Sequence, residues 1–257
     1  MDPQTQVSVV IPAYNAGDFI QATLATVAAQ TIMPREVIVV DDGSSDNTCA
    51  VVEAFSHANP QLRLCLLREP HRGPGASRNA GVQAASGSWI AFLDSDDLWA
   101  PQKLERMAAA SRQFPEANIL CHDEIHQRQY GSNRVLDYSK GYCTDRSLSE
   151  QLYIRNRFST SAVLCRRGVI LDYGGFDVTL PNGQDYELWL RMSPSLKVMF
   201  VPEVLGTYVD RSGNISSNHT WRRLMNELRI LQRHRDKVDN FTYITTLTRR
   251  FLSYGWL

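Results

Sequence analysis

The sequence has no net charge, no long apolar run and no paired cysteines, and each absence excludes a class of protein. Its 257 residues carry 27 Lys and Arg against 27 Asp and Glu, whereas nucleic-acid-binding proteins usually carry a basic excess. No apolar run approaches the roughly 18 residues that cross a membrane, and the N-terminus has no signal sequence. These absences predict a soluble, cytoplasmic protein that does not bind nucleic acid.

The cysteine count and the composition indicate a reduced globular domain. Five separated cysteines without a C-x-x-C pair favour free thiols over a disulfide framework. A hydrophobic share of 43% and a charged share of 21% are typical of a protein with a sizeable core. The length fits one large α/β domain or a domain with an appendage.

The first hundred residues alternate strand and helix patterns. Apolar runs predict strands, helical spacing predicts the helices between them, and this alternation predicts right-handed crossovers in a parallel sheet. The predicted strands are 7–11, 36–40, 62–67 and 88–93, and the predicted helices are 18–30, 46–57 and 75–86.

The pattern is less regular after Pro101. The fold class is predicted to be α/β, with a mostly parallel central sheet flanked by helices and a C-terminal helical extension. Residues 123–147 are predicted to be a polar excursion. The other predicted elements are helices 103–114 and 182–192, strands 118–122 and 161–165, two short strands between 196 and 208 around Pro202, and an arginine-rich helical stretch 220–252.

Polar clusters follow three of the predicted strands. Because the carboxyl ends of parallel strands share one edge of the sheet, where such sheets bind ligands, we expect the clusters to meet in one cleft. Turn formation or helix capping also explains each cluster taken alone. The clusters are Pro12-Ala13-Tyr14-Asn15, Asp41-Asp42-Gly43-Ser44 and Asp94-Ser95-Asp96-Asp97.

The third cluster predicts a cation site. Carboxylates packed together repel one another unless a positive charge lies among them. Mg²⁺ or Mn²⁺, held by one or two carboxylates and by phosphate oxygens, would supply that charge. The sequence therefore predicts a ligand that carries phosphate.

Segments 9–15, 39–46, 75–81 and 92–97 together resemble the family 2 inverting glycosyltransferases, which have the GT-A fold, and a fainter likeness continues through 183–191. The resemblance implies transfer of a sugar, with inversion, from a nucleotide-diphospho-sugar (a UDP-sugar above all) to a glycan or lipid-linked acceptor, in surface polysaccharide or glycolipid synthesis. It also implies a transferase domain over 1–210, with a nucleotide-binding half (1–115) and an acceptor-side half (116–210), followed by a helical extension (211–257).

The resemblance assigns the nucleotide site to the first two clusters. Asp42 would accept the imide N–H of a uracil-type base, which cytosine lacks. Pro12 and Tyr14 would wall that base, Asp41 would shape the pocket, and Arg78 would bring positive charge to the nucleotide.

The third cluster contains the D-x-D motif of the family. Asp94 and Ser95 would lie at the nucleotide, and Asp96 would bind Mn²⁺ or Mg²⁺. Asp97 would assist the metal, orient the acceptor or cap the next helix. Arg211 stands where the family often has histidine and would contact phosphate, and His219 is a second candidate for the role of that histidine.

An inverting transfer needs a carboxylate base opposite the leaving group. The family has a Glu-Asp pair there, and here the pair is Gln184-Asp185, so Asp185 is the expected base, although an aspartate in a first helical turn also complements the helix dipole. Glu187 is expected on the surface. Trp189 is expected to pack the helix or to edge the acceptor site.

The sequence leaves open two other functions and the role of the arginine-rich C-terminal helices. A sugar nucleotidyltransferase would need a basic glycine-rich loop after the first strand, which is absent. A non-catalytic sugar-nucleotide-binding module would explain Gln184 and Arg211. The arginines between 222 and 250 predict a solvated helical face or peripheral contact with an anionic membrane.

Overall fold

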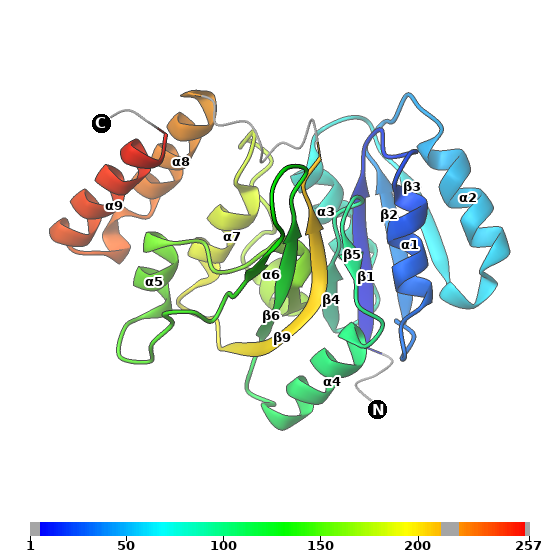
Figure 1. Ribbon diagram of the computed structural model, residues 1–257, viewed down its shortest axis with the longest axis horizontal. Helices are drawn as coiled ribbons and strands as arrows, with labels where there is room; N and C mark the ends of the chain where they lie inside the picture. The colour runs from blue at the N-terminus through cyan, green and yellow to red at the C-terminus, as the bar shows by residue number, and fades with distance from the viewer. Residues whose placement is uncertain (1–5, 212–220, 255–257) are drawn as a thin grey trace.

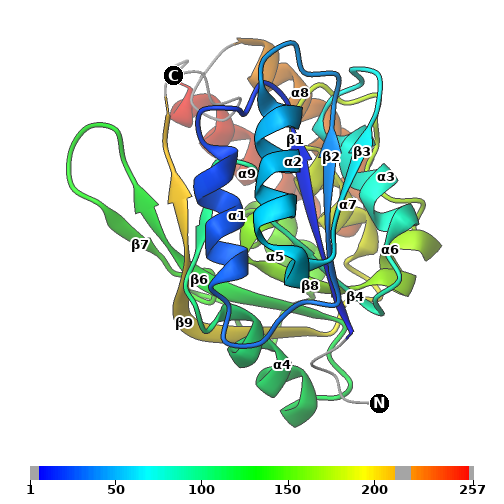
Figure 2. The ribbon, with the colours of Figure 1, turned by 90° about the vertical axis from the view of Figure 1, so that its right-hand side faces the viewer.

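The structure is a computed structural model that describes residues 6–211 and 221–254. The described residues form one nine-stranded sheet with the order β3-β2-β1-β4-β8-β6-β9-β5, and β7 pairs with β6. Helices cover both faces of this sheet, and Figure 2 shows α1 and α2 on one side of the first strands and α3 on the other.

The half of the sheet built from the first hundred residues is parallel, as the sequence predicted. β1 lies between β2 and β4, and β3 pairs with β2 at the edge. Three helices make the crossovers. The strands are β1 (Val7–Ala13), β2 (Glu36–Asp41), β3 (Leu64–Arg68) and β4 (Trp89–Phe92), and the helices are α1 (Ile20–Ala28), α2 (Thr48–Ala58) and α3 (Pro74–Ala84).

The other half of the sheet is mixed. β8 is antiparallel to β4 and to β6, whereas β9 is parallel to β6 and antiparallel to β5. A hairpin joins β6 to β7 where we predicted only a polar excursion. The strands are β5 (Leu98–Trp99), β6 (Ile119–Gln127), β7 (Arg134–Leu136), β8 (Val163–Arg166) and β9 (Val198–Val209).

The prediction of two short strands around Pro202 is wrong, because β9 is one strand of 12 residues. Its register against β6 shifts there: Val201 is opposite His122, but Val204 is opposite the next residue, Asp123. Proline has no N–H to give to a ladder, and a bulge accommodates it without ending the strand.

Two hydrophobic cores lie on the two faces of the sheet. Because side chains alternate along a strand, Val9 and Ile11 pack with Leu24 of α1, whereas Val10 packs with Val82 of α3. All of these side chains are buried, which explains why β1 is apolar except for Ser8, whose hydroxyl donates to Glu36 over 2.6 Å. The five cysteines are free thiols, as predicted.

The remaining helices are α4 (Lys103–Gln113), α5 (Leu148–Ile154), α6 (Arg167–Asp172), α7 (Gln184–Met192), α8 (Trp221–Arg233) and α9 (Asn240–Ser253). α8 and α9 lie side by side at the end of the molecule opposite α1 and α2 (Figure 1). They are joined to the body through α5, where the Tyr153 hydroxyl donates to the carbonyl of Leu231 over 2.8 Å. Among the described helices, none has the length and apolar character to cross a bilayer.

Candidate active site

The three polar clusters meet at the carboxyl edge of the parallel strands. The N–H of Asp42, just after β2, donates to Ala13 at the end of β1 over 2.8 Å. The N–H of Leu93, just after β4, donates to Val10 on the other side of β1 over 3.1 Å. Because β1 alone separates β2 from β4, the chains of the second and third clusters leave the sheet about 10 Å apart, as the sequence predicted.

Asp42 ties the second cluster to the start of α3. Its Oδ1 accepts the N–H of Arg72 and its Oδ2 accepts the N–H of Gly73, each over 2.8 Å. The Nδ1 atom of His71 lies 2.8 Å from the same Oδ2. A carboxylate oxygen has two lone pairs, so Oδ1 still has one for a donor from a ligand.

A pair of stacked rings stands beside Asp42. The rings of Tyr14 and His71 lie 4.1 Å apart at 25°, and 48% of Tyr14 is exposed. The sequence pointed to Tyr14 but gave no signal for His71. Asp42 itself is 2% exposed, and the other two residues assigned to the base are buried as well: Pro12 lies within β1, and Asp41 accepts the N–H of Ser44 over 3.2 Å.

Arg78 connects α3 to the third cluster. Its guanidinium lies 2.5 Å from Oδ1 of Asp94 and 5.5 Å from the centre of the Phe176 ring. The side chain is buried, and its Nε has no hydrogen-bond partner in the part of the chain that the structure describes. This cation is buried beside Asp94 and is not a solvated helix residue.

Asp96 is a half-buried carboxylate beside Asp94. It makes no ion pair with any described residue. Burial and the charge of Asp94 raise the pKa of Asp96 to about 6, against the opposing effect of Arg211 and Arg78. Arg211 also lies with its guanidinium 4.9 Å from the Phe19 ring centre.

Ser95 and His219 were also predicted to lie near the nucleotide or the metal. Ser95 is placed in the same loop, where its carbonyl accepts the Thr23 hydroxyl over 2.8 Å. His219 lies outside the described residues.

The buried side chain of Asp97 links its loop to two distant segments of the chain. The side chain is 1% exposed, and its two oxygens accept the hydroxyl of Ser161 over 2.6 Å and the N–H of Val209 over 3.0 Å. It does not cap α4, whose N-cap residue is Gln102, because the carboxylate turns into the protein. Burial, with the nearby carboxylates, raises the pKa of Asp97 well above its usual range.

The carboxylates of Asp94 and Asp96 fit a cation that is shared with a ligand. Among the described residues there is no cluster of three or more His, Cys, Asp and Glu that could hold a metal alone. Arg78 takes only one oxygen of Asp94, and Asp96 is unpaired by any described cation. Mg²⁺ and Mn²⁺ are commonly held in this way, by one or two carboxylates plus phosphate oxygens.

Asp185 lies in the first turn of α7. It is half-buried, and its Oδ2 lies 3.4 Å from Nδ2 of Asn156. Burial raises the pKa of Asp185, and the positive charge of Arg78 opposes this rise. The positive charge of Arg78 therefore acts on both Asp94 and Asp185.

Close packing brings the start of α7 against the start of α3. A Cβ at Gly75 would lie 2.6 Å from Oε1 of Gln184, so the end of that side chain would have to shift. Gln184 is buried and donates to the carbonyl of Leu180 over 2.7 Å. This contact fixes the distance between the two helix starts that carry Arg78 and Asp185.

Two expectations for α7 can be compared with its packing. Trp189 lies in the core, edge-on to Phe158 and Phe176 with ring centres 6.0 and 6.3 Å away, so it packs the helix and offers no surface to an acceptor. The expectation that Glu187 is exposed is wrong. Glu187 is 3% exposed and pairs with Arg191 and His234 at 2.9 and 3.3 Å.

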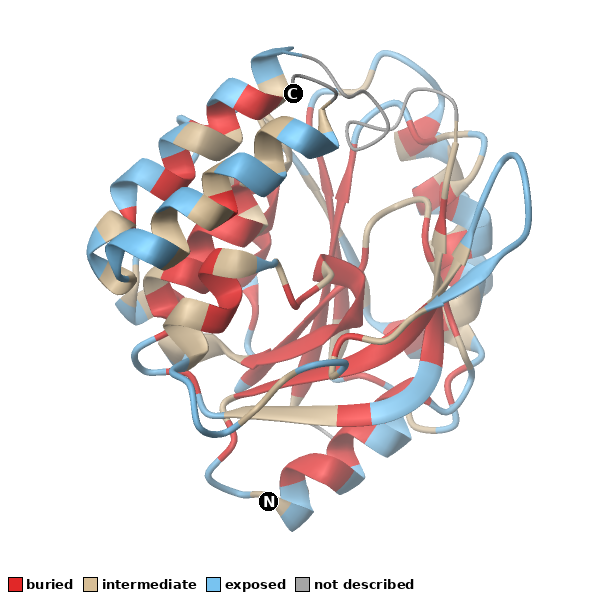
Figure 3. Cartoon of the chain, turned by 60° about the vertical axis from the view of Figure 1, so that its left-hand side comes forward, coloured by how far each residue is buried: buried red, intermediate tan, exposed pale blue. Residues whose placement is uncertain are grey.

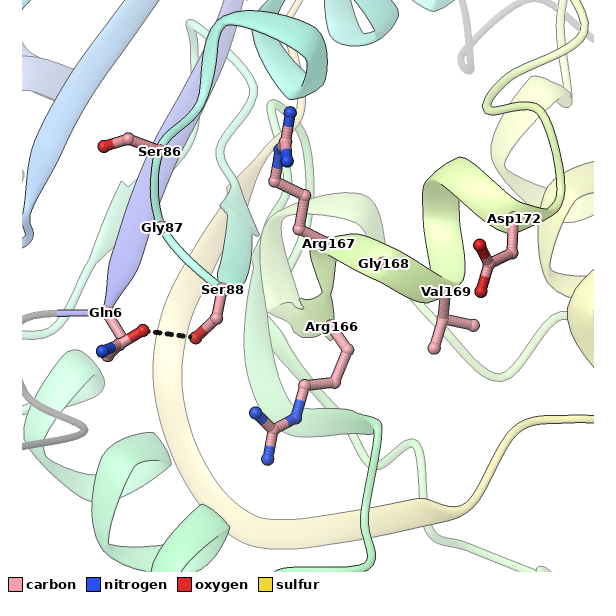
Figure 4. A pocket seen from close by; sticks show the side chains of 9 residues that line it. All are labelled: Gln6, Ser86, Gly87, Ser88, Arg166, Arg167, Gly168, Val169 and Asp172. Atoms are coloured by element: carbon pink, nitrogen blue, oxygen red, sulfur yellow. Dashed lines mark hydrogen bonds between the residues drawn. The ribbon is translucent and has the colours of Figure 1, made fainter. Parts of the chain in front are cut away.

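A separate hollow of about 530 Å³ lies at the opposite edge of the sheet, where Gln6 and Ser88 precede β1 and β4. Figure 4 shows it between these residues and α6. Its arginines are already used for packing: Arg167 donates to the carbonyl of Val82 over 2.8 Å, and Arg166 lies 4.1 Å from the Trp89 ring centre. None of the residues that line this hollow belongs to the three polar clusters.

Comparisons with known proteins give a family and a fold. Residues 8–171 match the sequence model described as "Glycosyl transferase family 2". The chain is 31% identical over 187 residues to Escherichia coli "UDP-Glc:alpha-D-GlcNAc-diphosphoundecaprenol beta-1,3-glucosyltransferase WfgD", covering 72% of this chain and 68% of that protein. It is 46% identical over 107 residues to Rhizobium meliloti "Succinoglycan biosynthesis protein ExoO", covering 42% of this chain but only 30% of that protein.

Two solved structures have the same fold. S. aureus TarS 1-349, in complex with UDP-GlcNAc, superimposes with a TM-score of 0.76 at 20% identity, over 97% of this chain and 73% of that one. The mannosyltransferase PcManGT from Pyrobaculum calidifontis, in complex with GDP-Man and Mn²⁺, gives a TM-score of 0.68 at 21% identity, over 99% and 72%.

Proposed function

Because the chain belongs to glycosyltransferase family 2 and has the GT-A fold, we propose that it transfers a sugar from a nucleotide-diphospho-sugar to an acceptor hydroxyl with inversion. One observation carries the proposal: the guanidinium of Arg78 lies 2.5 Å from Asp94, and its positive charge also acts on Asp185, where it opposes the rise in pKa that burial causes. A donor diphosphate and a catalytic base would need these groups in one cleft.

The donor's base would lie at Tyr14 and Asp42. The exposed Tyr14 ring offers a stacking surface. The free lone pair of Asp42 would accept an imide N–H, which favours uracil over cytosine. WfgD is named for UDP-Glc and TarS was solved with UDP-GlcNAc, so a UDP-sugar is the first donor to test. PcManGT was solved with GDP-Man, so GDP-Man is the second.

The diphosphate would lie between Arg78 and Arg211. Asp94 and Asp96 would hold Mn²⁺ or Mg²⁺, which when bound supplies positive charge to a departing diphosphate. The buried guanidinium of Arg78 adds a fixed charge that needs no reorganisation as the leaving group becomes more negative. Asp97 would keep the acidic loop in place.

Asp185 would act as the base. It would take the proton of the acceptor hydroxyl as that oxygen bonds to the anomeric carbon, while the bond from this carbon to the diphosphate breaks and its electron pair leaves with the nucleotide. Burial raises the pKa of Asp185, and a carboxylate with a raised pKa is a stronger base near neutral pH.

The acceptor would be a glycan or a lipid-linked sugar in the synthesis of a surface polysaccharide or glycolipid, as the names of WfgD and ExoO suggest. In this proposal residues 1–115 bind the nucleotide, residues 116–210 bind the acceptor, and the extension 211–257 follows them.

The extension would meet a membrane at its inner, cytoplasmic face. Residues 211–257 carry nine Lys and Arg but three Asp and Glu, a net charge of +6 in a neutral chain. α8 and α9 present outward faces (Figure 3) with five exposed apolar side chains, Trp221, Met225, Phe241, Ile244 and Leu252. Apolar side chains beside arginines favour anionic lipid surfaces.

Sedimentation with vesicles tests this contact. The chain should bind phosphatidylglycerol vesicles but not phosphatidylcholine vesicles, and Phe241→Ser with Ile244→Ser should weaken the binding. Equal binding to both vesicle types would contradict the electrostatic part of the proposal.

Donor hydrolysis tests the function itself. With Mn²⁺ and a panel of nucleotide sugars, we expect slow release of a nucleoside diphosphate from one donor and its loss with EDTA. Tight donor binding without turnover, with or without candidate acceptors, would favour a sugar-nucleotide-binding module. Pyrophosphate released from a nucleoside triphosphate and a sugar 1-phosphate would favour a nucleotidyltransferase.

A further inference from the structure

The turn that leads into α7 is held from outside by α8. Nδ2 of Asn226 donates to the carbonyl oxygen of Asn182 over 2.5 Å and lies 3.0 Å from its side-chain oxygen. Asn226 is only 4% exposed. The buried side-chain amide of Asn226 holds the backbone at Asn182 in place. If that backbone moved, the amide N–H and the Asn182 carbonyl would both lose their hydrogen-bond partner.

The next residue of the turn is also fitted to α8. Gly183 has a φ of +66°, and a Cβ there would lie 3.1 Å from Cδ1 of Ile230. The left-handed conformation favours glycine, and a Cβ there would also push the end of the Ile230 side chain aside by a few tenths of an ångström. The backbone from Asn182 to Asp185 is therefore held in one conformation, and α8 packs against it.

The residue that follows α8, His234, holds α7 a second time. Nε2 of His234 lies 3.3 Å from Oε1 of Glu187, one helical turn after the Asn182–Gly183 turn. Arg233 pairs with Asp177 at 2.5 Å, in the loop that precedes the turn. α8 thus contacts the segment before Asp185 and the first turn of α7 after it.

Asp185 itself has little else to hold it. Its carboxylate makes one contact with another element, a long one of 3.4 Å to Nδ2 of Asn156, and its other hydrogen bonds come from the backbone N–H groups of Asp185 and Tyr186 in the same turn. The carboxylate position is therefore set mainly by the backbone that carries it. A base must come within about 2.6–3.2 Å of the oxygen that it deprotonates, and a misplacement of about 1 Å costs on the order of 10²-fold in rate.

We infer that α8 is a positioning element of the catalytic site and that Asn226 is the residue that places Asp185. This inference rests on the proposed function, in which Asp185 is the base. It makes the C-terminal extension part of the catalytic machinery, not an appendage. Asn226 acts only through the Asn182–Gly183 turn and touches neither donor nor acceptor.

Asn226→Ala tests the inference by steady-state kinetics. We expect kcat to fall by about 10-fold to 10²-fold, with KM for the donor and the affinity for free UDP unchanged. Asn226→Asp should lose as much, because it keeps the size of the side chain but not its donor. Gln113→Ala, which removes an exposed amide from α4, is the matched control and should leave kcat unchanged.

Three results would overturn the inference. The first is an unchanged kcat in Asn226→Ala, and the second is a loss of kcat and UDP affinity in the same proportion, as expected from simple unfolding. The third comes from a measurement that does not depend on turnover. Hydrogen exchange of the backbone amides of residues 183–187 should accelerate in Asn226→Ala, while exchange of the β1 amides stays slow. Unchanged exchange at 183–187 would refute the positioning role even if no donor were turned over, whereas missing turnover in the unmodified chain would refute only the proposed function.

Discussion

Gly75→Ala is a sharp test of how the two helix starts are packed. Gly75 is the second residue of α3 and is buried. An added Cβ would meet three atoms of Gln184, Oε1 at 2.6 Å, Cδ at 2.7 Å and Nε2 at 3.0 Å. Ordinary contacts of a Cβ lie at 3.4 Å or more, so Gln184 would have to move.

The size of the effect follows from opposing contributions. Alanine in place of glycine in a helix gains roughly 0.5–1 kcal/mol. Overpacking a close contact costs about 1–3 kcal/mol, and losing the bond from Gln184 to the Leu180 carbonyl costs about 1 kcal/mol. We therefore expect Gly75→Ala to lower the free energy of unfolding by about 1–3 kcal/mol.

Gly168→Ala is the matched control. Gly168 is also the second residue of a helix, α6, but it is exposed and a Cβ there would meet nothing within 4 Å. This variant should be neutral or more stable by up to about 1 kcal/mol. Denaturant unfolding of both variants measures the difference.

A double variant locates the cause of the loss. Removing the obstacle in Gly75→Ala/Gln184→Ala should give a loss smaller than the sum of the two single losses, by on the order of 1 kcal/mol. Equal stability of Gly75→Ala and Gly168→Ala, or strict additivity in the double variant, would refute the packing argument.

Three further predictions concern the cleft and the C-terminal helices. Asp185→Asn should keep UDP affinity and lose about 10²-fold or more in transfer; full turnover would place the base elsewhere. Asp96→Ala should weaken Mn²⁺-dependent UDP binding in a calorimetric titration, and an unchanged Mn²⁺ dependence would contradict its role. Burial raises the pKa of Asp177, but hydrogen bonds from Thr179 and Arg233 and the charge of Arg233 outweigh it and lower that pKa to about 2. The carboxylate therefore stabilises the fold above about pH 4, and this is lost as the pH falls towards 2. Asp177→Asn should cost about 1–2 kcal/mol at pH 6, allowing for the partly exposed Arg233, and clearly less at pH 2, where much of the carboxyl is protonated; a cost that does not depend on pH would contradict the ion pair.

The parallel half of the sheet was predictable because its signals are local. Each strand of that half is a continuous apolar run, and each is followed by turn-forming or acidic residues. The rule that parallel strands end at one edge then places Asp42 and Asp96 together. That step needs no knowledge of side-chain packing.

The errors lie where distant segments meet. Glu187 was expected on the surface from its helical position alone, but α8 covers that face and brings His234 to it. The bulge that lets β9 continue past Pro202 depends on its partner β6. His71 and Asn226 carry no motif, so only the positions of Asp42 and Asn182 in space give them a meaning.

The pairing of β4 has a consequence for any attempt to divide the protein. β4 is bonded to β1 on one side and to β8 on the other, so residues 163–166 complete a strand ladder that begins in the first hundred residues. A fragment cut near residue 115 would expose the unpaired edge of β4, and open edges invite aggregation. We therefore expect residues 6–115 and the strands that follow them to move as one body, because one continuous sheet joins them.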